Sequence, residues 1–227
     1  MASKVKAIAV DIDGTLTDGS KRLSCPAIEA LRRQVDNKMT VMVVTGNVLP
    51  IAYALRQYLG FNGPVIAENG GVVSHGEDIK LIGSKEEPQK AFDQLSKFMK
   101  VEKLFSDRWR ETEVALKPKY DIEQIRKFTR GFDVKVFTTG WAIHITQKDT
   151  DKANGLAYVC KNWLRISMDD VAAIGDSDND INMIMNAGYG ITLSNGSQKC
   201  KDRADFVASK PHGEGVVEAL KWLGLEP

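Results

Sequence analysis

The feature that most constrains the fold is a short apolar run near the start of the chain that ends in two aspartates. Ala7 to Val10 are all apolar, and Asp11, Asp13 and Gly14 follow within four positions. A run of this length that stops at turn residues is typical of a buried strand and is too short for a core helix. Side chains two apart on an extended segment point the same way, so Asp11 and Asp13 are expected to share one site. An Asp-Gly turn without chemistry is the alternative interpretation.

Strand and helix patterns alternate at both ends of the chain. Apolar strand patterns lie at 40–44, 65–67, 171–174, 190–193 and 206–207. Helix patterns lie at 26–36, 48–59, 152–163, 181–186 and 216–223. This alternation is typical of a parallel, doubly wound α/β sheet. Ligands of such sheets bind just beyond the carboxyl ends of the strands, so the polar residues that end each run are candidate site residues.

The alternation stops between these two regions. Strand patterns at 71–74 and 79–82 flank a polar turn and predict an antiparallel hairpin. Mixed helix and strand patterns follow at 88–99, 113–116, 122–129, 134–138 and 141–145. We therefore expect a discontinuous core of residues 1–83 and 150–227, with a small α+β cap inserted at 84–149.

Composition and charge exclude several classes of protein. The 227 residues are 43% hydrophobic, which is enough for a sizeable core. The net charge is +1 without a basic stripe, so nucleic acid is not an expected partner. No apolar run suits a signal peptide or a membrane span. Cys25, Cys160 and Cys200 are far apart and odd in number, which argues for a reducing cytoplasm. The sequence leaves the oligomeric state open, a homodimer included.

Polar groups follow the core strands or begin the next helix. They are Asp11 with Asp13, Thr45 with Gly46, Lys152, Asp176 and Asp180. Nearby carboxylates repel one another unless a cation or a proton intervenes, so the aspartates favour a metal site. A lone lysine at a helix start is usually solvated, and helix-dipole effects slightly disfavour it there. Lys152 is included because it lies where the chain returns to the core.

These motifs resemble those of the haloacid dehalogenase superfamily of phosphotransferases. They are D-x-D-G-T, a threonine after the second strand, a lysine before a helix, and G-D-x-x-x-D. The position of the insert resembles the second cap class of that superfamily, and E-N-G-G at 68–71 supports it. The stretches V-T-G-N-V, G-P-V-I-A-E-N-G-G and D-R-W-R-E are similar to the archaeal phosphoglycolate phosphatases. The resemblance implies a Rossmann-like core and Mg²⁺-dependent hydrolysis of a small phosphate ester, with 2-phosphoglycolate as the favoured substrate.

The resemblance also implies a role for each site residue. Asp11 would be the nucleophile that forms an aspartyl phosphate, and Asp13 would be the general acid and base. The carboxylates of Asp11 and Asp176 and the backbone carbonyl of Asp13 would hold Mg²⁺. Asp180 would ligate the ion or orient its bound waters. The phosphoryl oxygens would be bound by Thr45, Gly46 and Lys152.

A substrate carboxylate calls for a cation in the cap, because arginine matches a carboxylate with two parallel hydrogen bonds. Arg108 and Arg110 flank Trp109 and would share a face on an extended segment. Surface arginines paired with Asp107 and Glu111 are the alternative interpretation.

Two other functions stay open. A sugar-phosphate phosphatase or a phosphosugar mutase of the same fold would use the same core residues. A mutase re-donates its phosphoryl group, so release of phosphate into water separates it from a phosphatase. A non-catalytic regulatory protein that binds metal or phosphate is the more remote alternative, and the intact pair of Asp11 and Asp13 argues against it.

Overall fold

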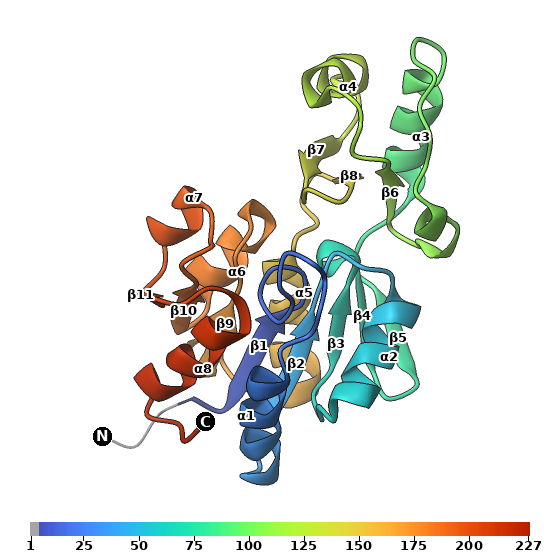
Figure 1. Ribbon diagram of the computed structural model, residues 1–227. Helices are drawn as coiled ribbons and strands as arrows, with labels where there is room; N and C mark the ends of the chain where they lie inside the picture. The colour runs from blue at the N-terminus through green and yellow to red at the C-terminus, as the bar shows by residue number, and fades with distance from the viewer. Residues whose placement is uncertain (1–4) are drawn as a thin grey trace.

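The computed structural model describes residues 5–227, so the first four residues of the predicted core lie outside it. Within this range the backbone forms an eight-stranded sheet and a separate three-stranded sheet (Figure 1). The strand order of the larger sheet is β11-β10-β9-β1-β2-β3-β4-β5, and β1 is flanked by β9 and β2. The polar residues that follow these three strands are therefore neighbours.

The strands from β11 to β3 in this order run parallel. They are β11 (Phe206–Val207), β10 (Tyr189–Thr192), β9 (Val171–Ile174), β1 (Ala7–Asp11), β2 (Thr40–Val44) and β3 (Val65–Ala67). The predicted hairpin extends the sheet antiparallel as β4 (Val72–His75) and β5 (Asp78–Leu81). In the register, Asp11 pairs with Val44 and Val10 pairs with Ile174.

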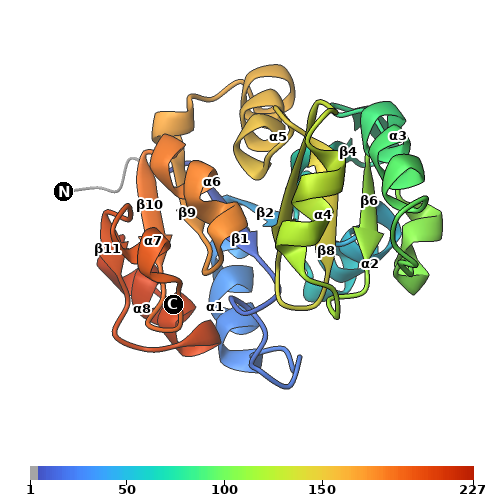
Figure 2. The same ribbon diagram turned by 90° about the horizontal axis from the view of Figure 1, so that it is seen from above.

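Helices cover both faces of the larger sheet (Figure 2). One face carries α1 (Cys25–Asp36), α2 (Leu49–Leu59) and α8 (His212–Trp222), and the other carries α5 (Lys152–Val159) and α6 (Ile181–Asn186). The short helix α7 (Gln198–Lys201) precedes β11. Successive residues of β1 alternate between the two cores: Ile8 and Val10 pack with the first set of helices, and Ala7 and Ala9 with the second.

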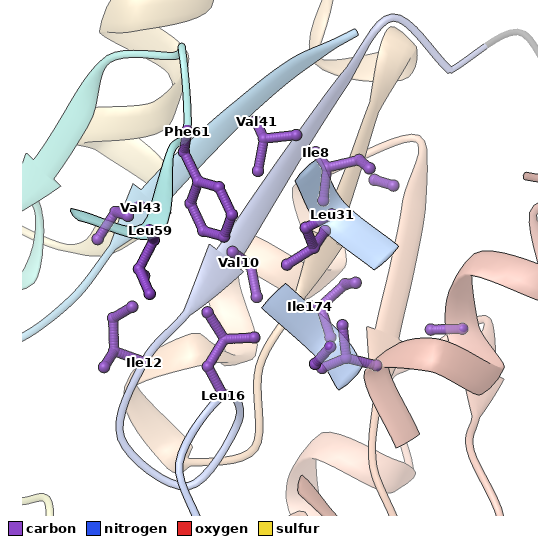
Figure 3. Packing of buried hydrophobic residues seen from close by; sticks show 14 of the residues in the cluster. Ile8, Val10, Ile12, Leu16, Leu31, Val41, Val43, Leu59, Phe61 and Ile174 are labelled. Carbon is purple, nitrogen blue, oxygen red and sulfur yellow. The ribbon is translucent and has the colours of Figure 1, made fainter. Parts of the chain in front are cut away.

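Central residues of the first core are buried around β1 (Figure 3). Ile8, Val10 and Leu31 are fully buried, and Ile174 packs in the same cluster. Burial of each such side chain contributes about 1.5–3 kcal/mol to the hydrophobic driving force. This packing on both faces fixes the position of β1 and, with it, of Asp11 at the end of the strand.

Residues 84–149, called the cap below, contain the three-stranded antiparallel sheet (Figure 1). Its strands are β6 (Glu113–Leu116), β8 (Ile143–Gln147) and β7 (Val134–Thr138), in that order across the sheet. Two helices, α3 (Glu86–Leu95) and α4 (Ile122–Thr129), pack against it. Leu95, Leu116, Ile125 and Ile143 belong to a hydrophobic cluster separate from those of the larger sheet.

The predicted α/β fold with an inserted α+β cap is confirmed, and the differences lie at element ends. The first cap helix begins at Glu86 rather than at Pro88, because proline is tolerated in a first helical turn. The last cap strand begins at Ile143, since Thr139 and Ala142 close a turn with a 3.1 Å backbone hydrogen bond. The final helix begins at His212, four residues before its predicted start.

Two expectations from composition are also addressed by the structure. Cys25, Cys160 and Cys200 are all free thiols, so the chain contains no disulfide between them. Among the helices of residues 5–227, none combines the length and apolar character that crossing a membrane requires.

Candidate active site

Three aspartates meet at the carboxyl ends of β1 and β9. Asp11 is the last residue of β1, Asp176 lies two residues beyond β9, and Asp180 ends the 3-10 helix η5 (Asp178–Asp180). One carboxylate oxygen from each lies within 4.8 Å of the others. Parallel strands that are neighbours bring their ends together, which is why residues so far apart in sequence meet here. Carboxylate oxygens are the hard ligands that Mg²⁺ prefers.

Lys152 joins two of these aspartates. Its Nζ donates to Asp11 Oδ1 at 2.6 Å and to Asp180 Oδ1 at 2.7 Å, and the lysine is only 1% exposed. The side chain starts at the first residue of α5, which Asp151 caps. Burial by itself lowers the pKa of Lys152, but Asp11 and Asp180 outweigh that effect and raise it above the usual lysine range. Lys152 is therefore a fixed positive charge in the site.

The aspartates themselves carry an excess of negative charge. Burial raises the pKa of Asp11 well above its usual value, and Lys152 opposes that rise. Burial and the neighbouring Asp180 raise the pKa of Asp176 to about 6. A divalent cation would favour the ionised forms of both groups, so the charge balance of this cluster fits a bound Mg²⁺.

Asp180 accepts hydrogen bonds on both of its oxygens, two of them from the loop that carries Asp176. Besides the bond from Lys152, Asp180 Oδ2 accepts from the backbone N–H groups of Asp176 at 3.2 Å and Ser177 at 2.9 Å. The loop that presents Asp176 is thus held by Asp180. Thr15 Oγ1 also donates to Asp176 Oδ1 at 3.0 Å.

Asp13 is held by donors other than Lys152. Its carboxylate accepts hydrogen bonds from Lys21 Nζ at 2.6 Å and from Asn47 Nδ2 at 2.7 Å. Asp11, Asp13 and Gly46 line one small cavity of about 10 Å³, as the spacing of the two aspartates predicts. The cap contributes the remaining wall through Thr139 and Trp141, together with Ser177 and Asn179 of the core.

Thr45 lies at the end of β2, next to this cavity. The threonine is fully buried, and its Oγ1 accepts a hydrogen bond from the backbone N–H of Asn47 at 3.1 Å. Its own backbone N–H donates to the carbonyl of Ile66 at 2.8 Å. Thr45 therefore holds the turn that carries Gly46 and Asn47 toward the aspartates.

The structure separates the two cap arginines. Residues Phe105–Trp109 form a 3-10 helix, η2, so the prediction that Arg108 and Arg110 share a face of an extended segment is wrong. Arg108 is exposed, and its guanidinium carbon lies 4.4 Å from the ring centre of Phe105. Arg110 is 3% exposed and donates to the carbonyl oxygen of Gly46 at 3.0 Å. Only Arg110 therefore reaches the core beside the cavity.

Arg110 has unused hydrogen-bonding capacity. Its Nη1 also bonds Glu113, but Nε and Nη2 are buried without a hydrogen-bond partner in the described part of the chain. Burial lowers the pKa of the guanidinium to about 10, so the group is still charged at neutral pH. A buried cation with free donors next to Gly46 fits an anionic group of a ligand.

Sequence reasoning did not predict three residues of the site, namely Lys21, Asn47 and Asn69. Lys21 and Asn47 bond Asp13, and Asn69 accepts from Asn179 Nδ2 at 2.9 Å. Asparagine and lysine after strands are ordinary turn residues, so their identity carries little signal. Asn69 could have been found from position, because E-N-G-G follows β3 at the same edge of the sheet.

Comparison with known proteins agrees with this geometry. The chain matches the family described as haloacid dehalogenase-like hydrolase over residues 8–130 and 84–220. The chain belongs to this family. The hydrolase is 45% identical over 225 residues to a phosphoglycolate phosphatase of Archaeoglobus fulgidus, with 98% of both chains covered. It is 39% identical over 217 residues to a phosphoglycolate phosphatase of Methanothermobacter thermautotrophicus, covering 96% of this chain and 98% of that one.

Solved structures share the fold of the hydrolase. Thermoplasma acidophilum 0175 superposes with a TM-score of 0.90 at 30% identity, covering 97% of this chain and 98% of that one. A subclass IIB sugar phosphatase, BT4131, has a TM-score of 0.82 at 20% identity, covering 97% and 99%, and shows the fold alone. The hydrolase is thus an enzyme, a phosphoric monoester hydrolase similar over its whole length to the phosphoglycolate phosphatases.

Proposed function

We propose that this hydrolase is a Mg²⁺-dependent phosphatase that converts 2-phosphoglycolate to glycolate and phosphate through an aspartyl-phosphate intermediate. The observation that carries the proposal is the cluster of Asp11, Asp176 and Asp180 around the buried Lys152. Phosphoryl transfer depends mainly on positioning and on neutralising the transferring oxygens. The aspartates would supply the positioning, and Lys152 together with a cation held by the aspartates would supply the positive charge. The names of the relatives from Archaeoglobus fulgidus and Methanothermobacter thermautotrophicus support the choice of substrate.

In the proposed reaction Asp11 is the nucleophile. Its carboxylate oxygen attacks phosphorus, the ester P–O bond breaks as the new bond forms, and Asp13 gives its proton to the departing glycolate oxygen. Asp13 then takes a proton from a water molecule that attacks the aspartyl phosphate. That step releases phosphate and restores the Asp11 carboxylate. The hydrogen bonds from Lys21 and Asn47 hold Asp13 in place for both proton transfers.

The residues around Asp11 fit a magnesium ion. The carboxylates of Asp11 and Asp176 and the backbone carbonyl of Asp13 would hold it, and the bound ion would neutralise charge on the phosphoryl oxygens. Asp180 accepts three hydrogen bonds, from Lys152 and from the backbone N–H groups of Asp176 and Ser177, and this favours an orienting role over direct ligation. Phosphoryl oxygens would also be bound by Thr45, Gly46 and Lys152.

The carboxylate of 2-phosphoglycolate is assigned to Arg110. The guanidinium lies beside Gly46, which lines the cavity of Asp11 and Asp13, and two of its nitrogens have free donors. A bidentate pair between these donors and a carboxylate would be charge-assisted and largely shielded from water. Arg108, which packs on Phe105 at the surface, has no part in this assignment.

The cap would act as a lid over the core of residues 1–83 and 150–227. The cavity of about 10 Å³ has room for about one water molecule, so a phosphate ester enters only when the cap of 84–149 moves. Closure would then exclude bulk water from the reacting groups. The three free cysteines support a reducing cytoplasm as the setting for this reaction.

One observation favours a second candidate, a sugar-phosphate phosphatase. A further cavity of about 240 Å³ between cap and core is lined by Lys152 and Asn179 and by Lys135 and Phe137 of β7. That volume exceeds what glycolate needs and would admit a larger leaving group.

A phosphate-release assay distinguishes these candidates. The purified enzyme with Mg²⁺ is offered 2-phosphoglycolate, a hexose phosphate and p-nitrophenyl phosphate, and kcat/KM is measured for each. We expect the highest value for 2-phosphoglycolate. A higher value for the hexose phosphate would replace the proposed substrate, and phosphoryl transfer between sugars without phosphate release would indicate a mutase.

A further inference from the structure

Glu68 is a core residue whose carboxylate binds the cap. It follows β3 in the 3-10 helix η1 (Glu68–Gly70) and is fully buried. Glu68 Oε2 accepts from the backbone N–H and the hydroxyl of Thr112 at 2.9 and 2.8 Å. Both carboxylate oxygens lie 3.1 Å from the backbone N–H of Glu111. One buried carboxylate thus satisfies two backbone donors and one side-chain donor across the boundary between core and cap.

The backbone at Glu68 is held in an unfavourable conformation to make this contact. Glu68 has φ +49° and Asn69 has φ +54°, a region that residues with a Cβ atom rarely adopt. Such conformations persist where the surrounding structure fixes them, and they cluster at functional positions. Asn69 also donates to Glu113 Oε2 at 3.0 Å, so two successive core residues bind successive residues of the cap.

The contact lies at the hinge of the cap. A Cβ atom on Gly83 would lie 2.9 Å from Thr150 Oγ1 and 3.3 Å from Thr112 Cβ. Gly83 and Thr150 flank the two covalent connections between core and cap, so the two connections lie side by side and Gly83 packs next to Thr112. A Cβ atom on Gly71 would lie 2.1 Å from Thr112 Oγ1, which leaves only glycine room beside it.

We propose that Glu68 is a positioning residue that anchors the cap at its hinge and thereby holds Arg110 against Gly46. Arg110 is two residues from Thr112, and its own carbonyl accepts from Lys85 Nζ at 2.7 Å. The anchored segment leads into β6, at one edge of the cap sheet, whereas β7 forms the opposite edge. The β6 edge therefore stays on the core while the opposite edge moves to admit substrate. The effect on substrate choice rests on the proposed function, but the anchoring does not.

The anchor is tested first without substrate, by hydrogen exchange in the Glu68→Gln variant. Glutamine keeps one acceptor oxygen, but it loses the negative charge and places an amide N–H group where Glu68 Oε1 faces the N–H of Glu111. The backbone amides of Glu111 and Thr112 should therefore exchange at least about tenfold faster than in the wild type. Exchange in α4, at the far side of the cap, should change less than about twofold. Glu218→Gln is the matched control, because Glu218 accepts from Ser209 Oγ and the Lys210 N–H within the core. Unchanged exchange at Glu111 and Thr112 in Glu68→Gln would overturn the anchor.

Kinetics then test positioning. For 2-phosphoglycolate we expect kcat/KM of Glu68→Gln to fall at least about tenfold, mainly through KM, because Arg110 loses its fixed position. For p-nitrophenyl phosphate, which lacks a carboxylate, we expect less than about a threefold change. Equal losses on both esters would overturn the positioning role. If the wild-type enzyme does not hydrolyse 2-phosphoglycolate, the proposed substrate is refuted. The hydrogen-exchange result would still test whether Glu68 anchors the cap.

A second variant covers the case in which Glu68→Gln does not fold. Thr112→Val removes only the hydroxyl donor to Glu68 and keeps the side-chain shape. It should show the same pattern in exchange and in kinetics with smaller changes. Where both variants fold, the double variant should lose less than the product of the single effects, because both changes break one contact. If the effect of the double variant equals the product of the two single effects, Glu68 and Thr112 do not act through one contact and the anchor is overturned.

Discussion

Lys152 donates a 2.6 Å hydrogen bond to Asp11 in a site where both side chains are almost completely buried. This pair links the residue that starts α5 to the residue that ends β1, 141 positions apart. Lys152 offsets part of the rise that burial causes in the pKa of Asp11. The charge of Lys152 favours the carboxylate form against the desolvation that burial imposes.

Lys152→Gln tests this pairing. The change leaves Asp11 and Asp180 buried without their cation, so we expect the free energy of unfolding near neutral pH to fall by about 3 kcal/mol. Phosphatase activity should fall at least about a hundredfold, because a positive charge next to the phosphoryl group is lost. Urea unfolding and steady-state kinetics measure the two effects. Lys161→Gln, an exposed lysine in the same region, is the control. A Lys152→Gln variant as stable and active as wild type would refute the pairing.

Metal removal tests the carboxylate cluster. Asp11, Asp176 and Asp180 place three carboxylate oxygens within 4.8 Å of one another, so we expect a phosphate dianion to bind there only together with a divalent cation. Treatment with EDTA should abolish phosphate release, and added Mg²⁺ should restore it. Full turnover in the metal-stripped enzyme would show that the cluster works without a divalent ion.

Two single variants separate the cap arginines. Arg110→Ala removes a charge-assisted contact worth about 2–3 kcal/mol, or roughly a hundredfold in kcat/KM for 2-phosphoglycolate. Hydrolysis of p-nitrophenyl phosphate should fall much less. Arg108→Ala, whose side chain packs on Phe105, is the matched control and should leave both activities close to wild type. Equal losses on both esters in Arg110→Ala would show a structural role instead.

His144 predicts a pH dependence of stability. Its Nδ1 lies 3.1 Å from Glu113 and its Nε2 lies 3.0 Å from Thr139. Burial lowers its pKa well below the usual value of 6.5, and Arg110 and Lys152 lower it further, despite opposing effects of Asp13 and Glu68. The unfolded chain therefore binds a proton before the folded one, so stability is lost as the pH falls below the unfolded pKa.

Urea unfolding at about pH 7.5 and about pH 5 measures this loss. We expect His144→Gln to lose less stability on acidification than the wild type, because the group that titrates is gone. His75→Gln, at an exposed histidine, should behave like the wild type. An equal loss of unfolding free energy on acidification in all three proteins would show that His144 does not cause the pH dependence.

The fold and the central acids follow from local sequence patterns. The run before Asp11 has the length and apolar character of a strand, as does the run before Asp176, and parallel pairing then brings their ends together. The cap strand Glu113–Leu116 and helix Ile122–Thr129 were predicted to the residue, since their patterns end at clear turn residues.

The cap contacts could not be predicted in this way. The helix η2 before Arg110 is tied to β6 because Asp107 Oδ1 accepts from the backbone N–H of Ala115 at 2.8 Å. This bond helps to fix the chain just before Arg110, and a local sequence pattern does not predict it. Glu68 and Thr112 are 44 positions apart in the sequence, so a local pattern cannot predict their contact either.

The central claim, that Asp11 carries the phosphoryl group, is tested most directly by phosphate release from 2-phosphoglycolate by Asp11→Asn. The amide occupies the same volume but is a poor nucleophile, so the variant should fold like the wild type and still bind substrate. We predict that its kcat falls at least about a thousandfold in the presence of Mg²⁺. A folded Asp11→Asn enzyme with turnover near that of wild type would contradict the assignment and with it the proposed mechanism.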